Sequence, residues 1–380
     1  MKIIFICGSL EIGKDGVGDY TRKLASEMIN QGHQCAIVGL MDRFVKHQKI
    51  EVQHHQNSYV NVIRLPYNRG YSMNCKQVRH WIYSFNPDWI SLQYVPFSFH
   101  NKGLPIGLGK VLKKAFSGWK FHVMFHELWI EKKTRQPLKK RIWSYLQKYN
   151  IKSFITVLQP TLVHTHLPIY QERLKGIGTY ARALSLFSNI DVVRNPFPKA
   201  PERFKLAFFS QVAVSSSLIE FINDFIQTTI AFNLSPELIL IGGSKTRMQK
   251  YVKDFECLCP GLTKVSATGF LKESEISQVI ASCDLGLTPI PAHALGKSGS
   301  VAAFFAHGIP VAALIVEEGY SQSQIGFFST HSTNSVLFDS NWQRFNDAKK
   351  AVLIAKNEIH ISTITSIFFL DLSEKNNYTR

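Results

Sequence analysis

Short apolar runs alternate with segments of helical periodicity along the first 190 residues. Apolar runs bounded by polar or Gly/Pro residues predict buried strands, and apolar residues recurring every three or four positions predict helices. The predicted strands are Lys2–Cys7, Cys35–Leu40, Trp89–Gln93, His122–Phe125 and Leu162–Thr165. The predicted helices are Gly18–Gln31, Leu104–Ser117 and Leu138–Tyr149. Strands separated by helices indicate a parallel sheet covered on both faces.

The same alternation starts again after a stiff connection. Asn189–Arg203 contains Asn195-Pro196-Phe197-Pro198, which disfavours helix and suits a linker between domains. The strands predicted beyond it are Leu206–Phe209, Leu238–Ile241, Lys264–Ala267, Leu285–Thr288 and Val311–Ile315. The helices predicted there are Leu218–Phe232, Met248–Leu258, Glu275–Ser282 and one that begins near Ser300.

This pattern predicts an α/β fold of two Rossmann-like, doubly wound domains. We expect an N-terminal domain at 1–190 and a C-terminal domain at 191–340. The remaining segment, 341–380, is expected to be helical and could pack back on the N-terminal domain. Ligands bind beyond the carboxyl ends of strands in such sheets. Two domains facing each other would therefore hold a ligand in the cleft between them.

Composition narrows the class of protein. Hydrophobic residues make up 45% and charged residues 19% of the 380 residues, as in folded proteins with more than one domain. The six cysteines are scattered, and the close pair Cys257 and Cys259 has no second Cys/His pair at zinc-finger spacing. We therefore expect no metal site and a reducing, cytoplasmic location. The apolar run at Lys2–Cys7 is too short for a signal peptide, and no segment is long and apolar enough to span a bilayer.

The charge is strongly positive and uneven. The net charge of +17 indicates an anionic partner, and residues 102–152 hold 13 Lys or Arg against two acids. Lys110–Lys114 and Lys139–Arg141 mix cations with apolar residues, which suits helices on the anionic inner face of a membrane or a polyprenyl-diphosphate acceptor. The alternative is the solvated face of ordinary surface helices. Nucleic acid is not expected, because no stacking platform accompanies the charge. Candidate membrane anchors are Phe116, Trp119 and Trp143.

The loop between the first strand and the first helix has the composition of a phosphate site. Gly16-Val17-Gly18 opens the helix, where glycines allow close approach and free N–H groups attract an anion. A dinucleotide fingerprint fits poorly, because Thr21 replaces its third glycine and Gly16 follows Gly8 by eight residues. Asp42 could nevertheless mimic the ribose-binding acid of such a site. A purely structural loop is the other alternative.

A second candidate phosphate loop precedes the helix near Ser300. Gly296-Lys297-Ser298 resembles a P-loop, but Pro291 stands where that motif has its first glycine, which disfavours a nucleoside-triphosphate hydrolase. What remains is a helix N-terminus with a lysine and two hydroxyls, a combination suited to a diphosphate. A solvated lysine in an ordinary loop is the alternative. The candidate diphosphate ligands are Lys297, Ser298, Gly299 and Ser300.

In their order along the chain, the motifs resemble those of the GT-B glycosyltransferases, specifically the retaining enzymes of glycosyltransferase family four. The resemblance runs from the first strand to about residue 340. The segments that carry it are Asp15–Tyr20, Gly32-His33, His122–Leu128, Arg194-Asn195-Pro196, Ile241-Gly242-Gly243, Thr268–Leu271, Ala281–Asp284 and Gly308–Val311.

The resemblance implies an enzyme that moves a sugar from a nucleoside-diphosphate sugar, with retention and without a metal or other cofactor. A cell-surface polysaccharide, a glycolipid or a similar molecule would be the acceptor. His126 would be the catalytic residue, contacting the donor sugar or the reacting centre. Gly16, Val17 and Gly18 would approach the diphosphate. The nucleotide-binding residues would be Gly243, Lys245, Phe270 and Leu271.

Two departures from the family leave the donor open. The family's paired glutamates fall on Leu295 and Ala303, and Phe209-Ser210-Gln211-Val212 lacks the Arg and Lys expected there. Donor recognition must differ, or it uses Lys297 and His293 instead. Two other functions stay open: a non-catalytic protein that binds a nucleotide sugar or an anionic lipid, and a nucleotide-sugar epimerase of the same architecture.

Overall fold

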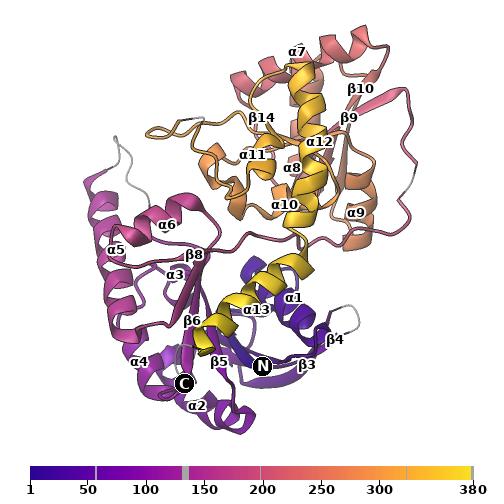
Figure 1. The fold of residues 1–380 in the computed structure, drawn as a ribbon. Coiled ribbons are helices and arrows are strands. Elements are labelled where there is room, and N and C mark those ends of the chain that lie inside the picture. The colour runs from indigo at the N-terminus through magenta and orange to yellow at the C-terminus, as the bar shows by residue number, and fades with distance from the viewer. Residues whose placement is uncertain (56–57, 131–136, 197, 322, 378–380) are drawn as a thin grey trace. The chain divides into compact units, whose positions relative to one another are not determined.

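The chain folds into two compact units, each built on one β-sheet (Figure 1). The computed structural model describes residues 1–55, 58–130, 137–196, 198–321 and 323–377. The first unit is Met1–Leu184 together with Thr365–Arg380, and the second is Ser185–Ile364. Both sheets have the doubly wound strand order, so the predicted α/β fold with two Rossmann-like domains is confirmed.

The sheet of the first unit has the order β3-β4-β2-β1-β5-β6-β7-β8. All neighbouring strands are parallel except β3 and β4, which form an antiparallel edge pair. No strand was predicted between Leu40 and Trp89, and a wholly parallel sheet was expected. The antiparallel pair β3 and β4 corrects both predictions. The strands are β1 (Lys2–Cys7), β2 (Gln34–Asp42), β3 (Lys49–His55), β4 (Ser58–Pro66), β5 (Trp89–Tyr94), β6 (Lys120–Phe125), β7 (Leu162–Thr165) and β8 (Arg182–Ala183).

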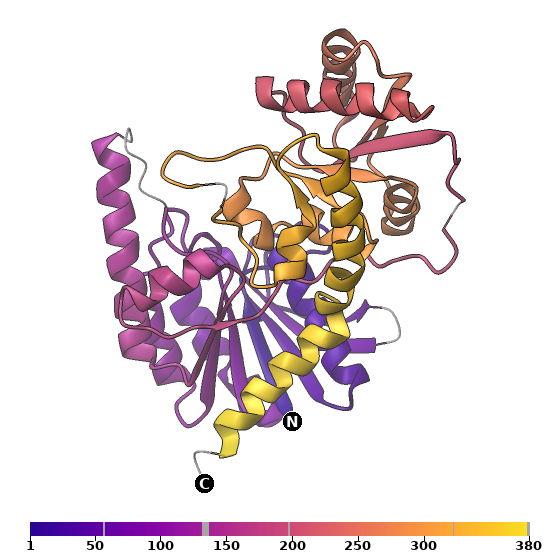
Figure 2. The ribbon, with the colours of Figure 1, turned by 45° about the horizontal axis from the view of Figure 1, so that its top comes forward.

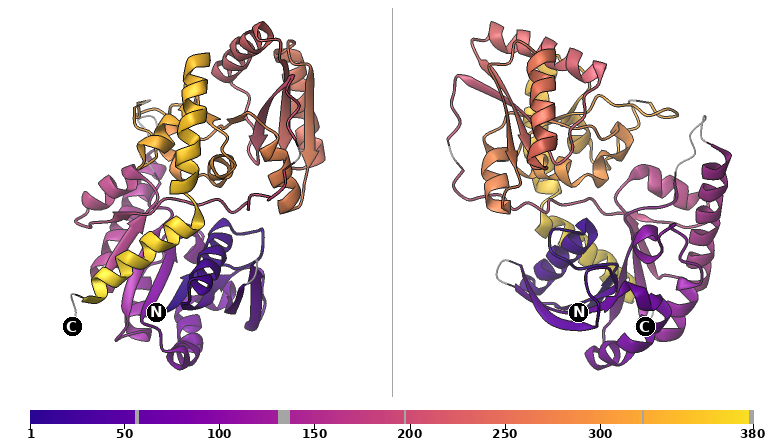
Figure 3. Two further views of the ribbon diagram at one scale, coloured as in Figure 1. Left: turned by 45° about the vertical axis from the view of Figure 1, so that its right-hand side comes forward. Right: turned by 180° about the vertical axis from the view of Figure 1, so that it is seen from behind.

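Helices cover both faces of this sheet. The C-terminal helix α13 (Ile361–Asn377) lies along one face, as Figures 2 and 3 show, and Phe368 packs on Phe5 while Phe369 stacks on His33. Helix α1 (Gly16–Asn30) lies on that face too, because its Tyr20 contacts the rings of His126 and His166 there. The remaining helical segments are η1 (Tyr67–Arg69), α2 (Gly70–Phe85), α3 (Pro96–Phe99), α4 (Leu108–Ala115), α5 (Leu138–Leu158) and α6 (Pro168–Lys175).

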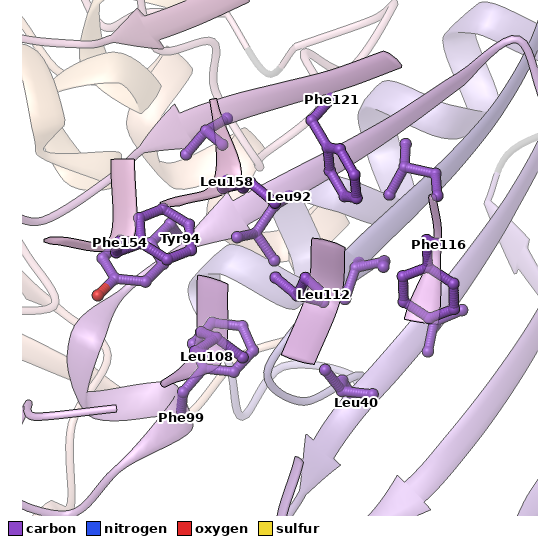
Figure 4. Packing of buried hydrophobic residues seen from close by; sticks show 14 of the residues in the cluster. Leu40, Leu92, Tyr94, Phe99, Leu108, Leu112, Phe116, Phe121, Phe154 and Leu158 are labelled. Atoms are coloured by element: carbon purple, nitrogen blue, oxygen red, sulfur yellow. The ribbon is translucent and has the colours of Figure 1, made fainter. Parts of the chain in front are cut away.

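The opposite face carries the main apolar core of this unit (Figure 4). Leu92 and Tyr94 of β5 pack there with Leu112 of α4 and Phe154 of α5. Each fully buried side chain of this size contributes about 1.5–3 kcal/mol to folding. Phe116, expected as a membrane anchor, is fully buried in this cluster, so that prediction is wrong. It continues the apolar stripe of α4 that faces the sheet.

The sheet of the second unit has the order β11-β10-β9-β12-β13-β14, with all neighbouring strands parallel. Its strand order reverses between β9 and β12, and separate apolar clusters lie on its two faces. The strands are β9 (Arg203–Phe209), β10 (Ser235–Ile241), β11 (Lys264–Gly269), β12 (Leu285–Leu287), β13 (Val311–Ala312) and β14 (Val336–Leu337). The helices are α7 (Ser216–Ala231), α8 (Lys245–Leu258), α9 (Glu273–Ala281), η2 (Ala292–Lys297), α10 (Gly299–Ala306), α11 (Thr330–Asn334) and α12 (Trp342–Glu358).

Candidate functional site

The loop after β1 is anchored on a buried carboxylate. Asp42 accepts hydrogen bonds from Ser9 Oγ at 3.0 Å, Leu10 N at 3.0 Å and Arg64 Nε at 2.7 Å. Burial raises the pKa of Asp42, but the bonds from Arg64, Phe44 and Leu10 lower it, and the net result is below its ordinary value. Both oxygens of the Asp42 carboxylate thus accept hydrogen bonds from other groups of the protein. A dinucleotide would lack its ribose-binding acid here.

The predicted diphosphate loop is packed and capped from within. A Cβ at Gly18 would lie 2.4 Å from Ser9 O, so this position accepts only glycine. The carboxylate of Asp15 caps α1 by accepting from Val17 N at 3.0 Å and Gly18 N at 2.8 Å. Gly16 has open space at its Cβ position. An anion at this helix N-terminus would therefore have to share these amides with Asp15.

A cavity of about 440 Å³ lies beside this loop, where the strand order reverses between β1 and β5. Its wall includes Gly8, Lys14, Asp15, Arg43 and Ser98. Ligands of doubly wound sheets bind at this kind of reversal, beyond the carboxyl ends of the strands. With two cations on its wall, the cavity is the candidate ligand site of the first unit.

His126 directly follows β6, and both of its ring nitrogens are held. Nε2 lies 2.9 Å from Gln93 Oε1, and Nδ1 lies 3.0 Å from Nε2 of His166. The ring of Tyr20 stands edge-on against both imidazoles. Burial, and after it the neighbouring His166, lowers the pKa of His126 well below its ordinary value. His126 is therefore a rigid and neutral imidazole at pH 7.

Gln93 and His166 were not predicted as partners of His126. A signal for them exists, because Ser91 and Gln93 flank Leu92 in one buried strand, and three polar residues, His164-Thr165-His166, follow two apolar ones in another buried segment. Strands buried on both faces normally read as continuous apolar runs. Polar residues within such buried strands indicate a polar layer on one face of the sheet.

In the second unit, the predicted lysine loop opens α10. Ser298 is the N-cap, and its Oγ accepts from Val301 N at 3.4 Å and lies 3.0 Å from Ser300 Oγ. Lys297 is exposed, and Gly299 has open space at its Cβ position. Because α10 follows β12, its N-terminus lies beyond the carboxyl end of that strand. The helix dipole and the lysine make this end attractive to an anion.

The predicted nucleotide-binding residues follow two neighbouring strands, β10 and β11. Gly243 has a φ of 82°, in the left-handed region that favours glycine. Phe270 is 83% exposed, and it lines a cavity of about 1090 Å³ between α8 and β11 together with Lys245. The wall of this cavity does not include Gly243 or Leu271. The structure thus brings Lys245 and Phe270 together.

The two positions that lack the family's glutamates belong to the core. Leu295 and Ala303 are both buried in the apolar cluster that also contains Val301 and Phe304. A carboxylate at either place would be buried among apolar side chains. Donor recognition by a glutamate pair is therefore excluded at these positions.

Ser210 was also missed, and its sequence offers no signal. It follows β9 with a φ of 70°, a left-handed conformation that is uncommon for residues other than glycine. Its N–H donates to the carbonyl of Ile241 at 2.9 Å, which ties the end of β9 to the end of β10. Such strained positions concentrate at functional sites.

No protein-family model matches the sequence, and neither does any curated protein. Solved structures match it over nearly its whole length. Anabaena HepE, in complex with UDP-glucose, is 16% identical with a TM-score of 0.56, and the match covers 98% of this chain and 100% of HepE. Sucrose-phosphate synthase of Thermosynechococcus elongatus is 14% identical with a TM-score of 0.58, over 98% and 99% of the two chains. A glycosyltransferase of Rickettsia africae is 12% identical with a TM-score of 0.59, over 98% of each. The chain therefore has the GT-B fold.

Proposed function

We propose that the chain transfers a sugar from a nucleoside-diphosphate sugar to an acceptor, with retention and without a metal or other cofactor. The observation that carries this proposal is the N-terminus of α10, where exposed Lys297 precedes the Ser298 cap beyond a strand of a GT-B sheet. Negative charge develops on the leaving diphosphate during transfer, and fixed N–H groups with a cation stabilise it. HepE, of the same fold, is described in complex with UDP-glucose.

In this proposal each unit has its own task. The second unit holds the nucleoside diphosphate through Lys297 and the N–H groups of Ser298–Ser300, and the nucleoside through the Lys245 and Phe270 region. The first unit supplies His126, whose neutral ring is fixed well enough to contact the donor sugar in one orientation. Leu295 and Ala303 stand where the family has its paired glutamates, and both are buried. The sequence therefore does not indicate which sugar is transferred, and the donor must be found by experiment.

Donor screening tests this function directly. We expect one or more of the UDP-, GDP- and ADP-sugars to raise the melting temperature and to be hydrolysed slowly without an acceptor. Binding without turnover, even with acceptors present, would favour a non-catalytic binding protein. Interconversion of donors with no acceptor would favour an epimerase. If none of these sugars binds, the proposal is wrong.

The diphosphate site has its own test. Lys297→Ala should weaken binding of the nucleoside diphosphate about 10-fold, or about 1.4 kcal/mol, because it removes a charge-assisted contact. Lys350→Ala is the matched control, since Lys350 is an exposed lysine on α12 that pairs with the exposed Asp347. Calorimetric titration of both variants measures the difference. Equal affinity of the two variants would remove Lys297 from the site.

We further infer that the acceptor is presented at an anionic membrane surface, where the protein is a peripheral, cytoplasmic enzyme. None of the helices in the described ranges is long and apolar enough to cross a membrane. The first half of α5 instead exposes apolar side chains beside the cations Lys139, Lys140 and Arg141. These exposed apolar residues are Leu138, Ile142, Tyr145, Leu146 and Tyr149. Exposed apolar and cationic side chains on one helix favour an anionic interface.

Liposome flotation tests the membrane inference. We expect the chain to float with vesicles that contain phosphatidylglycerol and not with neutral phosphatidylcholine vesicles, and flotation should fall as salt rises. Ile142→Ser should weaken it, whereas Leu353→Ser, at an exposed leucine of α12, should not. Partitioning that does not depend on salt or on Ile142 contradicts the inference.

A further inference from the structure

The edge strand of the second sheet, β11, borders the cavity of about 1090 Å³ that separates it from α8. Within the described ranges, β10 is the only strand that pairs with β11. The other edge of β11 therefore presents a row of backbone N–H and C=O groups without a neighbouring strand. The wall of the cavity on the α8 side is one helix face, with residues spaced three or four apart. These residues are Lys245, Met248, Gln249, Val252, Lys253 and Glu256.

The free edge of β11 lacks the usual protection against pairing. Proteins block sheet edges with charged or proline residues on the strand, or keep the edge strand very short. The edge strand of the first sheet, β3, carries Lys49 and Glu51, and the edge strands β8 and β14 are two residues long each. In contrast, the segment Val265–Gly269 of β11 has no charged residue and no proline, and Ala267 is exposed. This edge is therefore open to another extended segment.

The cavity beside this edge is positively charged. Three lysines of α8 line it, and Glu256 is the one acid among its lining residues. In the part of the chain that the structure describes, none of these three lysines forms an ion pair. Their charge is therefore available to an anionic partner. The three lysines are Lys245, Lys250 and Lys253.

The spacing of the lysines matches that of an extended chain. Lys250 and Lys253 are three residues apart on α8, which places their Cβ atoms about 5–6 Å apart. In a strand, side chains at alternate positions lie on one face and are about 6.6–6.8 Å apart. Two acidic residues at alternate positions of a segment added beside β11 can therefore meet both lysines at once.

A second copy of this chain does not suit the edge. Pairing β11 with β11 of another copy would bring Lys264 and the α8 lysines of both copies together, in a protein of net charge +17. Like charges placed opposite each other in paired strands are destabilising. The charge of the cavity thus favours an acidic partner over self-association.

We propose that β11 and α8 form a docking site for an extended acidic segment of another protein. The segment adds to the sheet as a strand beside β11 and places acidic residues at alternate positions against Lys250 and Lys253. In this mode of recognition, main-chain hydrogen bonds give affinity and alternate side chains give specificity. The proposal goes beyond glycosyl transfer and does not rest on it, although Lys245 and Phe270 at the carboxyl end of β11 are also the proposed nucleoside region.

Fluorescence anisotropy of the full chain with a labelled peptide tests this docking. The probe is acetyl-Thr-Glu-Thr-Glu-Thr-amide, about 17 Å long when extended, against about 16 Å for residues 245–256 of α8. We expect it to bind, and the same peptide with lysine in place of both glutamates not to bind. No binding of the acidic peptide at millimolar concentration would overturn the proposal.

N-methylation separates strand addition from simple charge attraction. The N–H groups of an edge-bound strand point alternately toward and away from its neighbour, so the Glu and Thr positions of the probe face opposite ways. N-methylation of the two glutamates and N-methylation of the central threonine should therefore differ, with one pattern abolishing binding and the other retaining it. If both methylated peptides bind like the parent peptide, or neither binds, the proposal is wrong.

Charge reversal locates the site on α8. Lys253→Glu should weaken the acidic peptide about 10-fold or more, because it replaces an attraction by a repulsion. Lys350→Glu, at an exposed lysine of α12, is the matched control and should retain affinity. Lys253 is exposed, so the substitution leaves the core intact. Equal affinity of the two variants for the peptide would contradict the proposal. Absence of donor binding or of glycosyl transfer leaves this test unaffected.

Discussion

The two faces of strands β5, β6 and β7 differ although they share one backbone. On one face Leu92, Val123 and Phe125 pack into the apolar cluster against α4 and α5. On the other face hydrogen-bonded side chains, among them Gln93 and His126, connect the strands to α13. Both faces are buried, so burial alone does not distinguish them.

The difference between these faces lies in what each contributes. Apolar burial is non-directional and stabilises in proportion to area, whereas a buried hydrogen bond adds only about 0.5–1.5 kcal/mol net. A chain of buried polar groups thus adds less stability than apolar side chains would in its place. It does fix the orientation of every member. The apolar face is therefore expected to carry stability, and the polar face to carry orientation of His126.

The largest expected change is a loss of unfolding free energy when a side chain of the apolar face is removed. Phe125→Ala should lower the free energy of unfolding by about 3–5 kcal/mol, because it leaves a cavity in a fully buried cluster. Phe44→Ala, at a half-exposed phenylalanine of the same unit, should change it by about 0.5 kcal/mol or less. Urea unfolding measures both. A loss of less than about 1 kcal/mol at Phe125 would break the comparison.

On the polar face, the next largest effect should be on turnover. His126→Ala should lower kcat about 100-fold, or about 2.7 kcal/mol, with little change in donor affinity, because the ring is held in one orientation for the transition state. His54→Ala, at an exposed histidine of β3, is the control and should keep kcat. Steady-state kinetics with the donor found by screening give the result. Unchanged kinetics in His126→Ala would remove it from the site.

Much of the fold follows from local pattern, and the exceptions are instructive. Strand β1 has the predicted bounds, because a strand buried on both faces appears as an unbroken apolar run. Strand β7 has its predicted bounds too, although only its first two residues are apolar. The pair β3 and β4 lies at the sheet edge, where Ile50, Val52 and Tyr59 are exposed and no such run exists. Helix α2 buries only four residues, among them Asn74, so its apolar stripe is weak.

The site was less predictable, because its partners are distant in sequence. The position of His126 at a strand end follows from the apolar run before it. Its hydrogen-bond partner His166 is 40 residues away, and the neighbouring His164 bonds to Asp371, which is 207 residues further along the sequence. Sequence periodicity does not show which helix covers a sheet face. Nor does it indicate that Asp15 caps helix α1 or that Phe116 is buried in the apolar core.

A smaller expected effect is a pH dependence of stability that comes from the polar face and not from the apolar face. The pKa values of His122, His126 and His164 lie below that of an unfolded histidine, about 6.5, so the unfolded state binds more protons below that pH. Stability present above pH 6.5 is therefore lost as the pH falls. Each buried neutral histidine costs about 1.4 kcal/mol between pH 7.5 and pH 5.5. Phe125→Ala should lower stability equally at both values.

His122→Gln isolates one of these contributions. Glutamine keeps a donor and an acceptor between Ser91 and His164, but it does not titrate. The loss of unfolding free energy from pH 7.5 to pH 5.5 should therefore shrink by about 1.4 kcal/mol relative to the wild type. Urea unfolding at the two pH values measures the change. An unaltered pH dependence would mean that His122 is not buried in its neutral form.

The smallest expected effect is the difference in stability loss between two carboxylates of α13, one mostly buried at the polar face and one exposed. Asp371 and Glu374 are one turn apart on α13 and both bind Arg182, but the side chain of Asp371 is 15% exposed and that of Glu374 is 58% exposed. Water screens the outer pair, so Glu374→Gln should lower stability by about 0.5 kcal/mol or less. Asp371→Asn should cost more at pH 7, because a neutral amide replaces the mostly buried carboxylate in the hydrogen bond to His164. Equal losses in urea unfolding would show that Asp371 is as solvated as Glu374 and that it does not belong to the buried polar face.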